Sequence, residues 1–372
     1  MDEKYMELAL SLAMRANGRT SPNPMVGAVL VRNGEIVGEG WHMRAGTPHA
    51  EIHALQAAGE LAYGSTLYVT LEPCSHHGRT GPCTEAIIKA GVKKVVIAMV
   101  DPNPLVAGNG INKLRRVGVE VVEGVLAKTA ARLNEVFLKW ITTRMPFTVL
   151  KTAMTLDGKI ATSSGHSRWI TGENARQQVH KLRDQYDAIL VGIGTVLADN
   201  PALTTRLPSE CHHPVRIVVD SLARTPLDSQ LVNDGLARTI IAVTKEAPSG
   251  RIEALAAKGV EVLVVPEDNA GVDLRHLFQL LGSQEITSIL VEGGAMVNAS
   301  ILKAGLADKV CWFIAPKIVG GHAAPGPIGG QGATFLHDAW QVKDMTAEFA
   351  GQDLMISGYL RDQEEYHVHR TC

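Results

Sequence analysis

The sequence predicts an α/β protein with two domains, and three observations lead to this fold class. The chain has 372 residues, which exceeds the ~100–200 residues of one typical domain. Apolar β-rich runs alternate with runs of helical periodicity in both halves, as in sheets covered by helices. The alternation breaks at residues 142–146, so we place the boundary there, between a domain of residues 1–145 and one of residues 146–372.

The first half predicts a sheet with helices on both faces. Asp2 can cap a first helix that ends near Asn17. Asn33 and Gly34 lie between two apolar runs, which predicts a β-hairpin with a type I′ turn. The remaining elements are expected in this order: a helix after His49, a strand over 65–71, a helix from Cys83, a strand over 95–100, a helix over 109–117, a strand over 119–122 and a helix over 126–140. Together they form an α/β/α layered domain.

The second half predicts a largely parallel sheet, because strands and helices alternate along it. Strands are expected over 147–154, 188–191, 216–220, 240–243, 260–265 and 288–292, and helices over much of the sequence between them. Thr171 is expected to cap one of these helices. Segments 309–315 and 354–359 are expected to add antiparallel edge strands.

Four residues of the first half have the pattern of a catalytic zinc site. His49 and two cysteines, Cys74 and Cys83, supply three ligands, which leaves one coordination position open for water. Zinc lowers the pKa of a bound water toward ~7. Glu51 is left to carry protons. This is the pattern of zinc-dependent deaminases, except that eight residues rather than two separate the cysteines.

Helix starts at two of the ligands make this site chemically reasonable. His49 and Cys83 each precede or begin a predicted helix, where the partial positive charge favours the thiolate that binds metal. Alternatively, the cysteines are core thiols and His49 is a helix cap. A third alternative is a zinc ion that only braces a binding module, which requires a fourth protein ligand.

Composition excludes several classes of partner. The formal net charge of -2 and the low aromatic content of 5% argue against a nucleic-acid partner, so a deaminase acting on nucleic-acid bases is disfavoured and a small-molecule substrate is expected. Five cysteines do not make a disulfide framework. No secretory signal and no apolar run approaching ~18 residues is present. We therefore expect a cytoplasmic protein that has no membrane partner.

Paired glycines in the second half suggest a nucleotide site. Gly293 and Gly294 separate a predicted strand from a helix, and Gly192 and Gly194 follow another strand. Such turns bring backbone N–H groups to a phosphate, so two of them in one sheet favour a dinucleotide. The alternative is that these glycines serve packing alone.

Three polar loops are expected at the rim of the zinc site. Residues 21–24 are Pro-rich and rigid, and they serve either as a connector or as a substrate contact. Residues 101–104 form a second rigid polar loop after a strand, which indicates the rim of the pocket. Residues 75–82 separate the two cysteines and include His76, His77 and Arg79. This loop is either solvated or holds an anionic part of the substrate, such as a phosphate.

The motifs taken together resemble one enzyme family. His49-Ala50-Glu51, the two cysteines, the segment LKTAMTLDGKIA at 150–161 and Glu292-Gly293-Gly294 resemble the bifunctional riboflavin biosynthesis deaminase/reductase. The resemblance covers both domains. It implies a cytidine-deaminase-like domain followed by a dihydrofolate-reductase-like domain. The alternative is another zinc nucleobase or nucleotide deaminase fused to a nucleotide-binding domain.

The resemblance also implies reactions and site residues. The first domain is expected to deaminate 2,5-diamino-6-(5-phosphoribosylamino)pyrimidin-4-one, and the second to reduce the ribosyl group to ribityl with NADPH. The substrate of the first domain is expected to contact Asn23, His42, Arg79, Asp101 and Asn103. NADPH is expected to contact Ala153, Trp169, Thr195, Asp199, Ser221 and the helix start after Gly293. Substrate contacts of the second domain are expected from Ser167, Arg183, Leu203, Arg206 and Glu292. We expect a homo-oligomer.

One further residue is a candidate for choosing between NADPH and NADH. Ser221 and Arg224 follow the strand over 216–220 and offer a hydroxyl and a guanidinium, which suit the 2′-phosphate of NADPH. Asp220 favours NADH instead if its carboxylate faces the ribose. Strand alternation can turn Asp220 and Ser221 to opposite faces.

Overall fold

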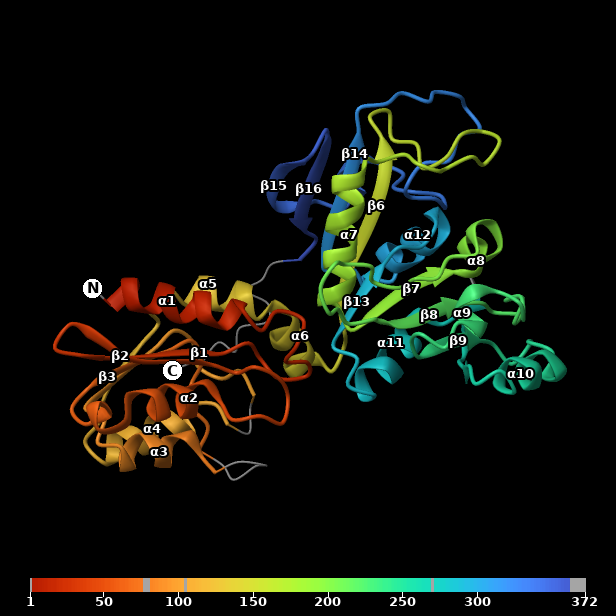
Figure 1. Ribbon diagram of the computed structural model, residues 1–372. Helices are drawn as coiled ribbons and strands as arrows, with labels where there is room; N and C mark the ends of the chain where they lie inside the picture. The colour runs from red at the N-terminus through yellow and green to blue at the C-terminus, as the bar shows by residue number, and fades with distance from the viewer. Residues whose placement is uncertain (1, 76–80, 104–105, 269–270, 362–372) are drawn as a thin grey trace. The chain divides into compact units, whose positions relative to one another are not determined.

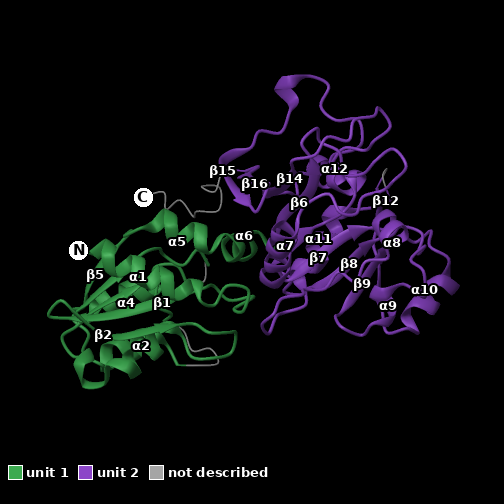
Figure 2. Ribbon diagram, turned by 45° about the horizontal axis from the view of Figure 1, so that its top comes forward, with its two compact units in different colours: residues 1–144, 363–372 green, residues 145–362 purple. Residues whose placement is uncertain are grey.

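The computed structural model describes residues 2–75, 81–103, 106–268 and 271–361. They form two compact units, of which the first reaches to Arg144 and the second begins at Met145 (Figure 2). No helix in these ranges is long and apolar enough to cross a membrane.

The first unit is a five-stranded sheet between two layers of helices. Its elements are α1 (Asp2–Met14), β1 (Gly27–Arg32), β2 (Glu35–Trp41), α2 (Ala50–Ala58), a 3₁₀ turn η1 (Gly59–Ala62), β3 (Thr66–Val69), α3 (Cys83–Lys89), β4 (Lys94–Ile97), α4 (Asn109–Arg116), β5 (Glu120–Glu123), α5 (Ala127–Leu133) and α6 (Glu135–Thr143). The sheet order is β2-β1-β3-β4-β5. β1 pairs antiparallel with β2 and β3, whereas β3, β4 and β5 are parallel.

Two apolar clusters, one on each face of this sheet, produce the layers. One cluster joins α1, α5 and α6 to the sheet through residues such as Met6, Leu12 and Leu138. The other joins α2, α3 and α4 to the sheet through residues such as Ala54 and Ile87. Figure 1 shows α1 and α5 on one side of the strands and α2, α3 and α4 on the other. The predicted α/β/α layering is confirmed.

The hairpin of β1 and β2 also agrees with the sequence pattern. Asn33 and Gly34 have φ values of 53° and 84°, the left-handed conformation that a type I′ turn requires at both central positions.

The predicted helix over 126–140 is wrong in one respect, because the structure divides it at Asn134. This side chain is buried and binds a distant backbone segment instead of facing solvent. Its Oδ1 accepts from the N–H of Met25 at 2.8 Å, and its Nδ2 donates to the Met25 carbonyl at 2.9 Å. A tertiary contact therefore overrides the local helical periodicity.

The second unit is built on a nine-stranded sheet of order β10-β9-β8-β7-β13-β6-β14-β16-β15. Its strands are β6 (Phe147–Thr155), β7 (Ala188–Gly192), β8 (Val215–Val219), β9 (Thr239–Val243), β10 (Glu261–Val264), β13 (Ser288–Val291), β14 (Lys309–Ala315), β15 (Lys343–Ala350) and β16 (Asp353–Tyr359), and a separate small hairpin joins β11 (Glu267–Asp268) and β12 (Gly271–Val272). Its helices are α7 (Glu173–Gln185), α8 (Ile193–Asp199), α9 (Gln230–Asn233), α10 (Ser249–Ala256), α11 (Leu274–Ser283) and α12 (Ala295–Lys303), with a 3₁₀ turn η2 (Leu336–Asp338).

Two expectations about this unit are wrong. Neither β14 nor β16 is an edge strand, because β14 pairs parallel with β6 and antiparallel with β16, and β16 also pairs with β15. The edge is β15, which the sequence pattern did not reveal because seven of its eight residues are exposed. Thr171 does not cap α7. The cap is Gly172, whose N–H donates to Oδ2 of Asp353 at 2.6 Å.

Candidate active sites

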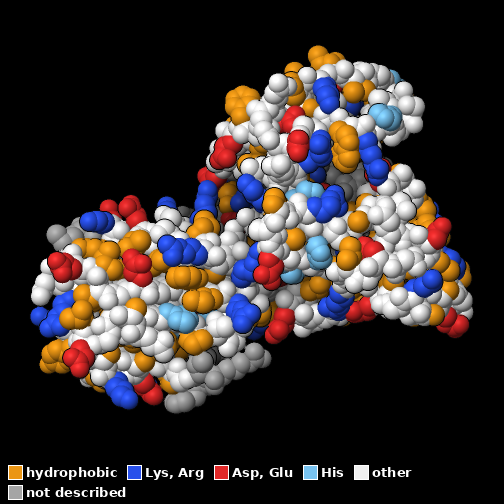
Figure 3. All heavy atoms as spheres, in the orientation of Figure 1, with side chains coloured by type: hydrophobic (Ala, Val, Ile, Leu, Met, Phe, Trp, Pro, Cys, Tyr) orange, Lys and Arg blue, Asp and Glu red, His pale blue; other side chains and the backbone are white. Residues whose placement is uncertain are grey.

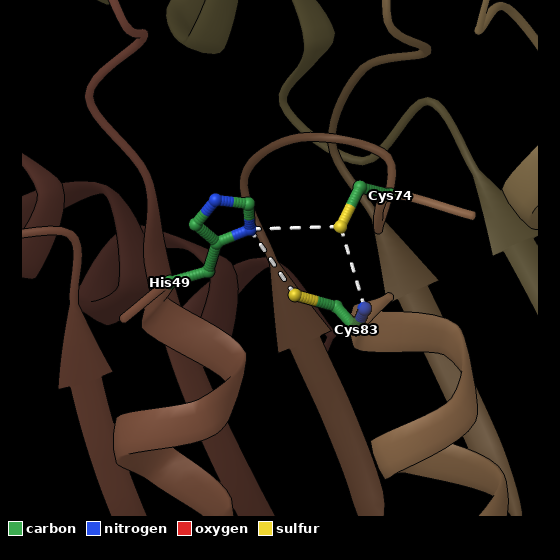
Figure 4. A group of neighbouring side chains, drawn as sticks. All are labelled: His49, Cys74 and Cys83. Carbon is green, nitrogen blue, oxygen red and sulfur yellow. Dashed lines mark hydrogen bonds between the residues drawn. The ribbon is translucent and has the colours of Figure 1, made fainter. Parts of the chain in front are cut away.

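Three side chains from separate elements of the first unit converge on one point. His49 is the N-cap of α2, Cys83 is the first residue of α3, and Cys74 lies in the turn after β3. Nδ1 of His49 lies 3.2 Å from Sγ of Cys83 and 3.6 Å from Sγ of Cys74. Figure 4 shows the three ligand atoms facing a common centre.

The donor set fits a zinc ion. The three ligand atoms all lie within 4.8 Å of one another, and one nitrogen and two sulfurs are donors that zinc prefers. A hydrogen bond with Cys83 lowers the pKa of Cys74 to about 4, against the opposing effect of burial and with a further hydrogen bond from His49. The same bond with Cys74, together with burial, raises the pKa of Cys83, so Cys74 is the more acidic thiol of the pair. Among the described residues, no fourth ligand joins the group. The group therefore resembles a catalytic site and not a closed structural one.

Glu51 lies beside these ligands in the first turn of α2. The side chain is 3% exposed, and burial raises the pKa of its carboxyl, while the neighbouring His49 lowers it. A carboxyl of raised pKa near a metal group is suited to accept and return a proton.

His42 connects this group to a residue expected at the substrate. Its Nε2 lies 3.2 Å from Nδ2 of Asn23, its Nδ1 lies 3.2 Å from the Pro48 carbonyl, and its ring meets that of His49 edge-on at 5.5 Å. Burial lowers the pKa of His42 and favours the neutral ring. The structure thus brings Asn23 and His42 to the metal group.

The other residues expected at this substrate come from two loops. Asp101 and Asn103 follow β4, and Oδ1 of Asp101 accepts from the Asn103 N–H at 2.9 Å. Arg79, with its neighbours His76 and His77, lies outside the described residues.

The second unit contains a cavity of about 1110 Å³, over the ends of β6, β7 and β13. In Figure 3 basic and histidine side chains gather around a hollow of this unit. Ten residues expected at the cofactor or the substrate line the cavity, namely Ala153, Ser167, Trp169, Arg183, Thr195, Asp199, Arg206, Glu292, Gly293 and Gly294. Its size, its cationic lining and the start of α12 fit a phosphate-bearing dinucleotide.

The glycines around this cavity have two different roles. A Cβ on Gly192 would lie 2.6 Å from Val297, and one on Gly293 would lie 3.1 Å from the same side chain. These two glycines let the strand ends approach α12. They therefore serve packing, which was the alternative to a role in phosphate binding. A Cβ on Gly194 would meet nothing within 4 Å, and one on Gly294 only Thr195 at 3.8 Å. At these positions the glycines leave open space that a ligand can approach.

A buried ion network lies in the cavity wall. Arg183 contacts Glu292 through Nε to Oε1 at 2.6 Å and through Nη2 to Oε2 at 3.0 Å, and Nζ of Lys151 lies 3.3 Å from Oε2. Burial alone would raise the pKa of Glu292, but the two cations outweigh it and hold the pKa at about 2. Glu292 is therefore a carboxylate at neutral pH.

Sequence analysis missed Lys151 and His180, which also line the cavity. Lys151 is the one charged residue of β6 and shares its cavity side with Ala153, two positions on. A single lysine in an apolar strand was the available signal. For His180, burial and then the charges of Arg183 and Arg206 lower the pKa to about 4.

Three of the expected residues do not line this cavity. Leu203 is 3% exposed and packs in an apolar core cluster. Oγ of Ser221 accepts from the Val272 N–H at 3.3 Å. Arg224 lies 3.8 Å from Asp220, whose other oxygen accepts from the N–H and the hydroxyl of Thr225.

Comparison with known families defines the class of protein. Residues 1–99 match the cytidine and deoxycytidylate deaminase zinc-binding region, and residues 146–356 match the RibD C-terminal domain. The fold and the two sites therefore define a zinc-dependent deaminase joined to a reductase.

Full-length relatives identify the family. The chain is 50% identical over 356 residues to riboflavin biosynthesis protein RibD of Actinobacillus pleuropneumoniae, covering 95% of this chain and 94% of that protein. It is 45% identical to the protein of the same name from Escherichia coli K12, covering 95% of this chain and 98% of that protein. The chain belongs to the RibD family, and it is a bifunctional deaminase and reductase of riboflavin biosynthesis that uses zinc and NADPH.

Solved structures agree in fold over both units. Acinetobacter baumannii RibD, form 1, has a TM-score of 0.87 at 39% identity, covering 96% of this chain and 98% of that one. The diaminohydroxyphosphoribosylaminopyrimidine deaminase/5-amino-6-(5-phosphoribosylamino)uracil reductase of Thermotoga maritima has a TM-score of 0.85 at 39% identity, with the same coverage. The predicted fold class, function and cofactors are confirmed.

Proposed function

We propose that residues 1–145 deaminate 2,5-diamino-6-(5-phosphoribosylamino)pyrimidin-4-one and that residues 146–372 reduce the ribosyl group of the product. The observation that carries the first assignment is the buried Glu51 beside a three-ligand donor set. The Thermotoga maritima protein is named for this pair of activities, which supports carrying them to this chain.

In the proposed deamination, His49, Cys74 and Cys83 hold the zinc ion. The ion, when bound, supplies a Lewis acid that activates water. Glu51 relays the two protons of the attacking water, one to the ring nitrogen next to the reacting carbon and one to the departing amine, so that ammonia leaves and a ring carbonyl forms. Asn23, His42, Arg79, Asp101 and Asn103 hold the substrate. His42 contributes by orienting Asn23, because its Nε2 lies 3.2 Å from Nδ2 of Asn23.

In the proposed reduction, the second unit orients two ligands against each other. Eight residues hold NADPH, namely Ala153, Trp169, Thr195, Asp199, Ser221, Arg224, Gly293 and Gly294. Five residues hold the substrate, namely Ser167, Arg183, Leu203, Arg206 and Glu292. NADPH supplies the hydride, and no protein nucleophile is needed. The Arg183–Glu292 pair fixes both side chains for substrate contact.

We also propose that the chain acts as a cytoplasmic homo-oligomer. Support for self-association comes from large apolar side chains on β15 and the segment before it, where Leu336 is 92% and Phe349 is 80% exposed. Such exposed groups often mark interfaces.

The deciding experiment measures zinc content and turnover on the free aminopyrimidine nucleotide, followed by NADPH oxidation with the deaminated product. We expect zinc-dependent ammonia release and product-dependent NADPH oxidation. Release of ammonia from nucleic-acid bases but not from the free nucleotide would support the alternative deaminase. Zinc content with no turnover on either substrate would favour the bracing role.

A further inference from the structure

Glu72 is a buried carboxylate two residues before the metal ligand Cys74. The residue is 4% exposed, and its own N–H donates to the Met99 carbonyl at 3.0 Å. This bond fixes the turn after β3 against the end of β4. Neither the deamination nor the family motifs described above use the carboxylate.

Four backbone N–H groups from one segment of the chain donate to this carboxylate. Oε2 accepts from Asp101 at 3.2 Å and from Gly108 at 2.9 Å. Oε1 accepts from Gly110 at 2.9 Å and from Ile111 at 3.2 Å. Gly108 is the N-cap of α4, so the carboxylate also lies at the positive end of that helix. Each bond to a charged acceptor is stronger than one between neutral groups.

The turn and the helix are in close contact as well. A Cβ on Gly110 would lie 2.1 Å from the Pro73 carbonyl oxygen and 3.2 Å from Oε1 of Glu72. Glycine at this position therefore lets the start of α4 reach the peptide that joins Pro73 to Cys74. The contact leaves little room for the two segments to shift independently.

The segment that Glu72 holds includes Asp101, and Asn103 is bound to Asp101 in turn. The Asn103 N–H donates to Oδ1 of Asp101 at 2.9 Å, while the Asp101 N–H donates to Glu72. One side chain thus connects the turn of a metal ligand with the two residues assigned to the substrate.

We propose that Glu72 is a positioning residue of the deaminase, which sets the place of Asp101 and Asn103 relative to Cys74. The proposal rests on the proposed function, because that function assigns Asp101 and Asn103 to the substrate. Glu72 acts through these residues and does not itself contact the reacting atoms.

The test is Glu72→Gln, assayed for zinc content, kcat and KM of deamination. Glutamine keeps the shape of the side chain, but its NH2 group takes the place of one oxygen and faces N–H donors. The hydrogen bonds accepted by at least one of the two oxygens are therefore lost. We expect zinc to be retained and kcat/KM to fall ~10²-fold, mainly through KM, as for other small displacements of a binding group. The matched control is Glu120→Gln, which changes an exposed carboxylate of the same unit and leaves KM unchanged.

Several outcomes would overturn the proposal. If Glu72 has a purely structural role, Glu72→Gln lowers the midpoint temperature of thermal unfolding but leaves KM unchanged below that temperature. Loss of zinc from Glu72→Gln would mean that Glu72 serves only to hold the zinc ligand Cys74. If Glu72→Gln does not fold, Glu72→Asp decides, because it keeps the charge on a shorter side chain and must still raise KM.

Amide exchange gives a readout that does not depend on turnover. We expect the amides of Asp101, Gly108 and Gly110 to exchange faster in Glu72→Gln than in the wild type. Unchanged exchange would refute the positioning role. The amides can exchange faster in Glu72→Gln while the wild type fails to deaminate the free nucleotide. That result would refute the proposed function, but it would support the role of Glu72 in holding this segment.

Discussion

Arg183 and Glu292 form a bidentate ion pair inside the reductase cavity, with contacts of 2.6 Å and 3.0 Å. Their side chains are 12% and 9% exposed, and Lys151 adds a second cation 3.3 Å from the same carboxylate. Removing one partner of such a pair leaves an uncompensated buried charge, which costs far more than breaking an exposed pair.

We therefore expect Glu292→Gln to destabilise the second unit by ~3–5 kcal/mol at neutral pH. The change in the free energy of unfolding is measured by denaturant unfolding, with the protease resistance of that unit as the readout. Glu261→Gln is the matched control, because it breaks an exposed pair with Arg238, which is worth ~0–1 kcal/mol. Equal small losses in both variants would contradict the importance of burial.

The Glu292 carboxylate also predicts how the stability of the second unit depends on pH. The folded pKa of Glu292, about 2, lies below its ordinary value of 4.5, so the unfolded chain takes up the proton first as pH falls. The stability that Glu292 contributes is therefore complete above about pH 4.5 and is lost between about pH 4.5 and pH 2. In Glu292→Gln this part of the pH dependence should disappear; an unchanged acid profile would show that other carboxylates dominate.

Glu51→Gln should retain zinc and nearly abolish deamination. An amide can neither accept the proton of the attacking water nor return it to the departing amine, so we expect a loss of ~10²-fold or more in kcat. Metal analysis and ammonia release check both halves of the expectation. Near-normal turnover in a zinc-loaded variant would remove Glu51 from the mechanism.

Local patterns were sufficient to predict much of the deaminase site. His49, Cys74 and Cys83 could be grouped because helix starts and strand ends meet at one sheet edge, and the structure brings the three together. Contacts between distant segments were not predictable in the same way. Asn134 divides a periodic helix to bind Met25, and Glu72 holds amides about 30 to 40 positions further along the chain.

In the reductase, the alternation of apolar β-rich runs with helical runs predicted most strands, but it did not predict every residue that lines the cavity. Lys151 was hidden within a family motif, and its role in the cavity wall depends on β6 lying beside β13, which carries Glu292 at its end. β15 was missed for a different reason. Seven of its eight residues are exposed, so no buried apolar face imposes an alternating pattern on its sequence.

Cys74→Ala should lose zinc and deamination while NADPH-dependent reduction of the deaminated intermediate survives. The reason is that the two units have separate apolar clusters, with cluster members of the first unit ending before Arg144. Separate assays of the two reactions, with zinc analysis, check this. Cys311→Ala is a control, because it removes a cysteine that belongs to β14 and not to the metal group. Simultaneous loss of reductase activity and protease resistance in Cys74→Ala would show that the units depend on each other.

The last prediction concerns Arg224 and the choice of NADPH over NADH. β8, which precedes Ser221 and Arg224, lies next to β7, whose end begins α8 with Thr195 in the cavity wall. A dinucleotide extending from the cavity along the strand ends would therefore approach this turn. Asp220 does not oppose the assignment, because it is fully buried and its Oδ2 accepts from the N–H and the hydroxyl of Thr225 at 2.7 Å and 2.8 Å.

Arg224 is an exposed cation at this turn, with a side chain that is 58% exposed. Arg251 also reaches the turn, but its guanidinium donates to the carbonyls of Ala223 and Thr225. A charge-assisted bond to the 2′-phosphate is worth ~1.5–3 kcal/mol, so Arg224→Ala should lower the NADPH:NADH ratio of kcat/KM by ~10-fold or more. Steady-state kinetics with both cofactors measure the ratio. Arg238→Ala, which changes an exposed arginine beside Glu261, should leave it unchanged. If the ratio in Arg224→Ala also equals that of the wild type, the preference for NADPH is set elsewhere in the site and Arg224 is a solvated charge of the turn.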